Sequence, residues 1–488
     1  MTHETFTATL ALVGLVILVS SLLSGAVERT GLPQVAIFLL LGAALGPAGL
    51  GLVELPLESN ALQVIATLAL VLVLFSDAIG VDIGEVRRQP RLALTILGPG
   101  TLIPAAIISL AAWLLLDLPA PAAAILGAAL ASTDPVLLRT LVRHPAVPPS
   151  ARLALRLESG MNDVILLPIV VLSMVALQPA RPEAGSELAR HVVGLFLLGP
   201  LLGGVVGYAG ITLLDRVRRS VGVRRDYESL YALGVAFTAF AAAEGVGGSG
   251  FLAAFGAGLV IAALDVELCD CFLDYGEASA EMFLLLTFVA FGASLIWSGV
   301  TVADGPTVLF ALIALLVRTV VLLPVLGRST LATRDRRIIS WFGPRGLSSL
   351  LLVLLPVFAD VPGSERLFQI TCLVVLLSVL LHGSGIALYL RRLAGSSVPL
   401  PAPAPTPASA PAPSEPEAEA PERITIEEFK RLRDEGRPVI VADVRTERSY
   451  RDDKLRAAGA LRLPPDDAVR LARERRLDQH ATLVLYCT

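Results

Sequence analysis

Two acidic residues stand in the middle of stretches that are otherwise apolar, and they are the groups best able to do chemistry in this chain. The first belongs to Ser132-Thr133-Asp134-Pro135. Pro135 has no amide hydrogen to donate and disfavours helical dihedral angles at Asp134, so we expect the helix to be interrupted here. The interruption would leave backbone carbonyls beside a carboxylate, and hard cations prefer such clusters of oxygen atoms.

The second acid, Asp163, lies in the next apolar stretch together with Glu158, Ser159 and Asn162. At about 100° per residue, these four side chains fall within an arc of about 140° on one helix. We expect this polar face to look toward the interruption at Asp134. A charge at the centre of a bilayer costs at least about 2.5 kcal/mol, so an acid placed there requires a reason.

A third polar group, Arg345, lies in Gly343-Pro344-Arg345-Gly346 near the start of a long apolar stretch. The glycines and the proline predict a second irregular helix, and paired interruptions in two halves of a chain are typical of inverted-repeat transporters. Two simpler interpretations remain open from the sequence. Arg345 could extend its charge to the cytoplasmic surface, and Glu158 could pair with Arg152 or Arg156 at a helix end.

Other residues of reactive type give weaker signals. Asp77 lies near the inner end of the third apolar stretch, where it is either part of a cation entrance or an ordinary interfacial acid. The five histidines are scattered, and we interpret them as structural or surface groups. Cys269 and Cys271 have no histidine nearby and lack the usual ligand spacing, so no metal site is predicted.

The composition indicates what must position these groups. Of 488 residues, 55% are apolar and 17% are charged, and the mean hydropathy is +0.73. These values are typical of an all-α polytopic membrane protein embedded in a lipid bilayer. The chain has no basic patch interleaved with aromatic residues, so nucleic acid is not expected as a partner.

A membrane-spanning helix needs roughly 20 mostly apolar residues, and the sequence offers about thirteen such stretches. We place them near 6–24, 33–50, 61–79, 92–116, 120–142, 153–178, 189–213, 226–243, 249–264, 281–298, 306–326, 336–357 and 367–390. Arginines gather in alternate loops, at 87–91, 139–156, 216–225 and 328–337, whereas the opposite loops have only Arg181, Arg190 and Arg366. The positive-inside rule then predicts an external N-terminus and a cytoplasmic C-terminus in a bacterial inner membrane.

The three motifs together resemble those of the NhaP/NHE-type sodium–proton antiporters. The resemblance covers about residues 6–392 and is carried by Ser132-Thr133-Asp134-Pro135, by Glu158-Ser159 with Asn162-Asp163, and by Gly343 with Arg345-Gly346. It implies an inverted-repeat fold with two broken, crossing helices, a moving core domain, a fixed dimerisation domain and hence a homodimer. One departure is Asp77, where many members of the family have glutamate.

The resemblance also implies roles for individual residues. The residue matching Asp163 binds a cation and a proton in alternation, and those matching Thr133, Asp134 and Ser159 complete the shell of the ion. Asn162 marks the electroneutral branch. Glu158 and Arg345 match a structural salt bridge in the core.

Our mechanistic expectation is that a proton and a cation (Na⁺, Li⁺ or K⁺) compete for the single carboxylate of Asp163. Burial disfavours the charged form, whereas neighbouring oxygens and a bound cation favour it. If only the loaded forms cross the membrane, competition alone couples the two fluxes. With Asn162 neutral, exchange is expected to be 1:1, and this transporter, which is not an enzyme, would need no cofactor.

The C-terminal part has a different composition. Residues 1–393 are expected to form the membrane domain, and residues 394–422, rich in proline and alanine, a semi-rigid linker. From residue 423 onward the pattern predicts α/β structure, with a helix at 425–435 and strands at 439–443 and 483–486.

This α/β part resembles a rhodanese-like (sulfurtransferase) domain through Asp443-Val444-Arg445, the turn at Gly459-Ala460 and Tyr486-Cys487. In that family the cysteine matching Cys487 carries a persulfide. Because the sequence ends at Thr488, directly after this cysteine, a truncated domain is expected. A sulfurtransferase tail would suit a transporter of sulfur oxyanions, which is the alternative function. Against it, anion sites use helix N-termini and basic residues rather than buried carboxylates.

Overall fold

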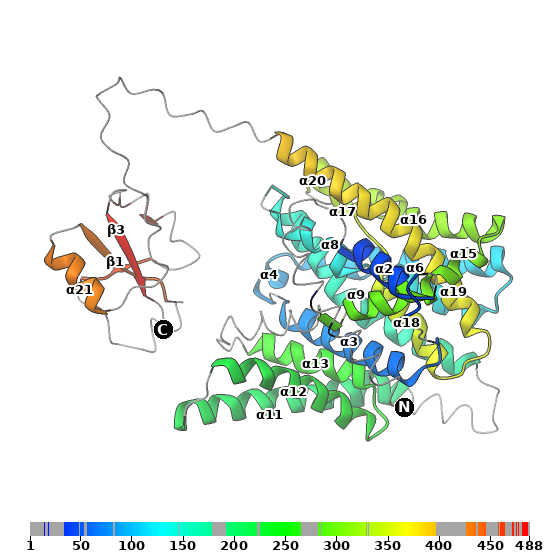
Figure 1. Ribbon diagram of the computed structural model, residues 1–488, viewed down its shortest axis with the longest axis horizontal. Helices are drawn as coiled ribbons and strands as arrows, with labels where there is room; N and C mark the ends of the chain where they lie inside the picture. Colours follow the sequence, from blue (N-terminus) through cyan, green and yellow to red (C-terminus); the bar gives the residue numbers. More distant parts are fainter. Residues whose placement is uncertain are drawn as a thin grey trace. The chain divides into compact units, whose positions relative to one another are not determined.

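The computed structural model divides the chain into two units, Met1–Leu400 and Pro401–Thr488. It describes residues 34–177, 192–264 and 282–396, with short gaps at 48, 53–55, 82, 145, 222–224, 284, 328 and 330, parts of 426–486, and the isolated residues 14 and 18. Figure 1 shows that the described residues of the first unit are helical almost throughout, whereas the second unit contains a small sheet. The predicted combination of a helical part and an α/β part is therefore observed.

Most helices of the first unit are joined by short loops or π- and 3₁₀-turns. They are α2 (Gln34–Leu45), α3 (Asn60–Ile79), α4 (Ile83–Arg88), α5 (Pro90–Leu97), α6 (Pro99–Leu116), α7 (Ala120–Ala131), α8 (Pro135–Arg143), α9 (Pro149–Leu177), α11 (Gly199–Ser220), α12 (Arg225–Glu244), α13 (Gly250–Ala263), α15 (Ser298–Thr301), α16 (Gly305–Leu326), α17 (Thr333–Trp341), α18 (Leu347–Phe358), α19 (Ser364–Ser378) and α20 (Ser384–Ser396), with the turns η1 (Gly194–Leu198), η2 (Leu295–Trp297) and η3 (Val379–Gly383).

Seven helical segments among the described residues are long and apolar enough to cross a membrane, and four shorter helices are also apolar. The seven are Asn60–Ile79, Pro90–Leu116, Ala120–Arg143, Pro149–Leu177, Gly194–Arg218, Gly305–Leu326 and Ser364–Leu393. Each of them overlaps a predicted span, but the number thirteen is not reached, and the span expected at 6–24 lies outside the described residues apart from two positions.

Local sequence explains where several helices begin. The Ser59 and Ser249 side chains accept hydrogen bonds from the amides at the starts of α3 and α13. Asp304 does the same for α16, where Pro306 occupies the first turn. These side chains pair amide groups that have no partner within the helix. On α6, Leu110 and Trp113 are exposed, which suits a face turned toward lipid.

Small residues allow α3, α11 and α13 to approach closely, and Figure 1 shows α11, α12 and α13 side by side. A Cβ atom built on Gly207 would lie 2.7 Å from the carbonyl oxygen of Ala257, and one on Gly203 would overlap Ala253. Gly258 lies in the same way against the backbone of Phe75 in α3. These glycines therefore have the packing role that is common in membrane helices.

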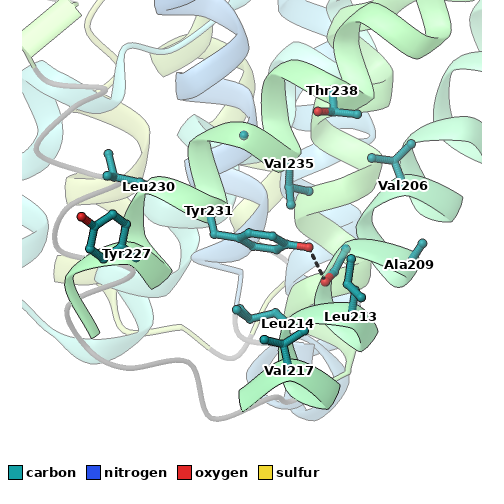
Figure 2. A pocket seen from close by; sticks show the side chains of 12 residues that line it. Val206, Ala209, Leu213, Leu214, Val217, Tyr227, Leu230, Tyr231, Val235 and Thr238 are labelled. Atoms are coloured by element: carbon teal, nitrogen blue, oxygen red, sulfur yellow. Dashed lines mark hydrogen bonds between the residues drawn. The ribbon is translucent and has the colours of Figure 1, made fainter. Parts of the chain in front are cut away.

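An apolar groove of about 870 Å³ lies between α11 and α12 (Figure 2). Leu213, Val217 and Leu230 line it, and the Tyr231 hydroxyl at its wall donates to the carbonyl of Gly210 at 2.9 Å. All residues lining the groove are uncharged. Because it offers no carboxylate, the groove does not suit a cation. None of its lining residues belongs to the polar motifs.

The second unit contains α21 (Ile426–Asp434) and a parallel sheet in the order β2 (Leu461–Arg462), β1 (Val439–Asp443), β3 (Thr482–Tyr486). The predicted helix and strands are thus confirmed. Arg445 forms a buried ion pair with Asp443, whose carboxylate also accepts from Tyr486. These hydrogen bonds lower the pKa of the Asp443 carboxyl to about 2. Cys487 lies outside the described residues, so the rhodanese-like assignment and the domain boundaries stay predictions.

Candidate ion-binding site

The first predicted interruption is present where the sequence placed it. Helix α7 ends at Ala131, the backbone is extended at Ser132 and Asp134, and α8 begins at Pro135. Ser132, Thr133 and Asp134 are fully buried. The fixed ring of Pro135 suits the first position of a helix, where an amide hydrogen has no partner in any case. A local proline therefore creates the break and turns polar groups inward.

The second interruption separates α17, which ends at Trp341, from α18, which begins at Leu347. It crosses the first, because the amide of Asp134 donates to the carbonyl of Pro344 at 2.9 Å. A Cβ atom at Gly346 would overlap the Asp134 carboxylate, so glycine is required by the close approach of the two chains. The expected pair of crossing, broken helices is observed.

Asp134 caps two helices at once. Its Oδ1 accepts the amide of Val136 in α8 at 2.9 Å, and its Oδ2 accepts the amide of Leu347 in α18 at 3.2 Å. Both donors belong to helix N-termini, where partial positive charge favours a carboxylate. The backbone therefore holds this acid in place and favours its charged form.

Arg345 acts at the opposite end of the first break. Its Nη1 donates to the carbonyls of Ala131 at 2.8 Å and Ser132 at 3.0 Å, and to the Thr133 hydroxyl at 3.2 Å. These are the terminal carbonyls of α7, which lack partners within that helix. Arg345 is fully buried, so its interpretation as a group reaching the cytoplasmic surface is wrong.

Glu158 pairs with a different arginine from the one expected. Arg318 of α16 donates through Nε to Oε1 at 2.6 Å and through Nη2 to Oε2, and both side chains are buried. Arg318 also donates to the carbonyl of Ser340 at the end of α17. The predicted salt bridge to Arg345 is therefore wrong: Arg345 bonds the α7 carbonyls through Nη1, and its Nε and Nη2 have no hydrogen-bond partner among the described residues. The alternative, pairing of Glu158 with Arg152 or Arg156, is not observed either.

Asp163 belongs to α9 and lies against both breaks. It is almost fully buried and close to Asp134, its carboxylate accepts a hydrogen bond from the Ser132 hydroxyl, and the Ser348 hydroxyl lies nearby. These two hydroxyls come from the first break and from the first turn of α18. Unlike the amides around Asp134, hydroxyls can rotate and either donate or accept. Asp163 is thus the acid whose surroundings can adapt to a change of charge.

The remaining candidates divide into two groups. Asn162 is fully buried, and neither polar atom of its amide has a hydrogen-bond partner. The Thr133 hydroxyl instead donates to Glu158, and that of Ser159 donates at 3.4 Å to the Arg156 carbonyl of its own helix. Their side chains therefore belong to the structural network in this state, rather than lying on Asp163.

The comparisons with known proteins agree with this geometry. Residues 15–392 match the family described as the transmembrane sodium/hydrogen exchanger. The chain belongs to the sodium/hydrogen exchanger family. It is 26% identical over 394 residues to "K(+)/H(+) antiporter NhaP" of Alkalimonas amylolytica, covering 79% of this chain and 66% of the relative. It is also 26% identical over 344 residues to "Na(+)/H(+) antiporter NhaG" of Bacillus atrophaeus, covering 68% and 64%. The match thus spans just under two thirds of these relatives.

Solved structures support the same fold. The sodium proton antiporter MjNhaP1 of Methanocaldococcus jannaschii, at pH 8, superposes with a TM-score of 0.62 and 20% identity, covering 78% of this chain and 99% of that one. The described part of the exchanger domain therefore has the fold of that protein. The likeness carries the arrangement of helices, whereas roles of single residues rest on the contacts given above.

The sequence did not identify three residues of this exchanger site. Ser132, inside the first quoted motif, bonds Asp163, and Ser348, two residues after the third motif, lies near it; neither was assigned to Asp163, and Arg318 was not singled out. A signal for Arg318 was present, since it is the one charged residue in the apolar run of α16. Asp77 lies beside the site helix, because a Cβ on Gly160 would be 3.5 Å from its Cβ.

Proposed function

We propose that this protein exchanges a monovalent cation for a proton across the bacterial cytoplasmic membrane, and that Asp163 binds the two in alternation. The observation that carries the proposal is the surroundings of this carboxylate. It is buried at the crossing of two broken helices, it accepts only hydroxyl donors among its described partners, and it adjoins an amide without partners. Such an intramembrane acid is a functional group by default.

Two acids meet at the crossing, and their contacts give them different tasks. Asp134 binds two backbone amides that cannot turn away, one on each oxygen, so a proton on either oxygen would weaken the cap of one helix N-terminus. Asp163 binds hydroxyls, which lose little when the carboxylate takes up a proton. The exchanging group is therefore Asp163, and Asp134 supplies a fixed negative charge next to it.

The same hydroxyls allow one site to accept either ion. With a proton on Asp163, the acid can donate to the Ser132 or Ser348 oxygen. With a cation present, those hydroxyls can turn their lone pairs to the ion and donate elsewhere, while Asp163 is ionised. The amide oxygen of Asn162, which has no partner, is a further ligand of the kind that Na⁺, Li⁺ and K⁺ accept.

Charge accounting predicts electroneutral 1:1 exchange. Of the two acids at the crossing, Asp134 retains its charge and Asp163 changes it, whereas Asn162 is neutral. One positive charge then moves in each direction, so membrane voltage does no net work on the cycle. The named relatives transport K⁺ and Na⁺ respectively, which supports a monovalent cation as the substrate of this chain.

The remaining features of the proposal concern the whole protein. The arginine distribution supports an external N-terminus and a cytoplasmic C-terminus. Asp77, beside Gly160, is placed to attract cations toward the polar face of α9. We also propose that the protein works as a homodimer. The sulfur-oxyanion alternative gains no support, since the named relatives are cation/proton antiporters.

Reconstitution of Asp163→Asn in liposomes with an internal pH dye tests the function. Wild-type protein should alkalinise the lumen in response to an inward gradient of K⁺ or Na⁺, but not of thiosulfate, and Asp163→Asn should not respond. Asp304→Asn is the matched control, because Asp304 is an exposed helix cap and asparagine caps equally well. Alkalinisation by Asp163→Asn at the wild-type rate would exclude Asp163 as the exchanging group.

A further inference from the structure

The backbone amide of Arg345 has a hydrogen-bond partner that is not part of the candidate ion site. Its amide donates to the Ser378 hydroxyl at 2.7 Å, and both residues are fully buried. Arg345 lies in the extended segment between α17 and α18, where no helical carbonyl is available for this amide. A buried amide without a partner costs about 1–3 kcal/mol, so the contact with Ser378 holds this part of the second break in place.

Ser378 is the last residue of α19, and the π-turn η3 follows at Val379–Gly383. The turn places His382, also buried, with Nδ1 3.2 Å from the Ser378 hydroxyl. The His382 ring lies 6.1 Å from the ring of Trp341, the last residue of α17. Ser378 and the π-turn that follows it therefore contact the second break at Arg345 and at Trp341, and such turns are frequent at functional sites.

The hydrogen-bonding capacities of these groups allow a continuous chain when the His382 ring carries its proton on Nε2. A serine hydroxyl has one hydrogen and two acceptor positions. Since Ser378 accepts the Arg345 amide, its hydrogen is available for Nδ1 of His382, which accepts it when the ring is neutral with its proton on Nε2. The chain then runs from the Arg345 amide through Ser378 to His382, and each bond polarises the next.

We propose that Ser378 and His382 are positioning residues for cation binding. They hold the Arg345 peptide so that its guanidinium reaches the carbonyl of Ser132, whose hydroxyl in turn binds Asp163. They act through the backbone and do not touch the ion. The inference rests on the proposed function, because it assigns the effect of these residues to the affinity for the exchanged cation.

Hydrogen exchange tests the contact without requiring transport. Deuterium uptake of the peptide spanning 342–347 should be about fivefold faster in Ser378→Ala and His382→Leu, as expected for the loss of one hydrogen bond. His382→Asn keeps a polar acceptor and should restore the wild-type rate. Thr371→Val is the matched control, because Thr371 is equally buried in α19 but bonds only the Leu367 carbonyl of its own helix.

The transport assay on the same variants tests the role. In Ser378→Ala and His382→Leu the KM for the cation should rise about fivefold with little change in maximal rate, and the double variant should be no worse than either single one. Wild-type KM values in these variants, additive effects, or failure of His382→Asn to restore KM would each overturn the proposal. If His382→Leu does not fold, Ser378→Ala and His382→Asn still decide it. Wild-type protein that exchanges no cation would instead refute the proposed function, while deuterium uptake would still report on the contact.

Discussion

Replacing Arg318 by methionine should destabilise the protein strongly, because it leaves the Glu158 charge buried without its partner. Both side chains are almost fully buried, at 2% and 3% exposure, and Arg318 donates two hydrogen bonds to the carboxylate and one to the Ser340 carbonyl. Breaking a buried ion pair from one side costs about 3–5 kcal/mol. Of this loss, about 1 kcal/mol belongs to the Ser340 contact, which is independent of Glu158.

The double variant Arg318→Met with Glu158→Gln separates these contributions. Removal of both charges should recover most of the loss and leave the cost of the Ser340 contact, so the coupling energy between the two sites should be at least about 2–4 kcal/mol. The assay is reversible unfolding in detergent, followed for the wild type, both single variants and the double variant. Arg345→Met, combined with Glu158→Gln, is the comparison, since Arg345 bonds the α7 carbonyls instead. Stronger coupling of Glu158 to Arg345 than to Arg318 would refute the pairing described above.

Two further predictions follow from the crossing. Gly346→Ala should abolish transport and lower stability, because the added methyl group overlaps the Asp134 carboxylate. Gly234→Ala should be neutral, because open space surrounds that glycine. Exchange rates and unfolding midpoints of the two variants check both expectations. Asn162→Asp adds a second carboxylate beside Asp163, so exchange should become sensitive to voltage. Imposing a membrane potential with valinomycin and K⁺ measures this, and rates independent of potential in that variant would contradict the charge accounting.

The sequence predicted both helix breaks because their causes are local. Pro135 and Gly343-Pro344 act on the backbone within one or two residues, and the polar face of α9 follows from the helical period alone. The π-turn after Ser378 was not predicted, although His382-Gly383-Ser384-Gly385 departs from the apolar pattern there and such glycine and serine residues often accompany helix irregularities.

The partner of Glu158 depends on contacts between distant segments. Arg318 lies 160 residues further along the chain, and whether it or Arg345 reaches Glu158 depends on which face of α16 packs against α9. Spacing within a helix carries no information about this choice. The resemblance to antiporters suggested Arg345. The structure shows instead that Arg345 bonds the terminal carbonyls of α7 and that Arg318 of α16 pairs with Glu158.

The charged groups at the crossing have two different tasks. Three of them hold the broken helices together, and one, Asp163, is proposed to exchange a proton for a cation. Asp134 caps α8 and α18, Arg345 caps α7, and Arg318 joins the end of α17 to Glu158. Each of these groups bonds backbone atoms that cannot reorient, so a change of its charge would weaken contacts that hold the broken helices. The Asp163 carboxylate, in contrast, bonds no backbone group among the described contacts, and its partner is the Ser132 hydroxyl, with the Ser348 hydroxyl nearby. A transporter that must change one charge in every cycle without unfolding its broken helices requires this division, and it is the reason to expect the exchanged proton on Asp163 and not on its neighbour.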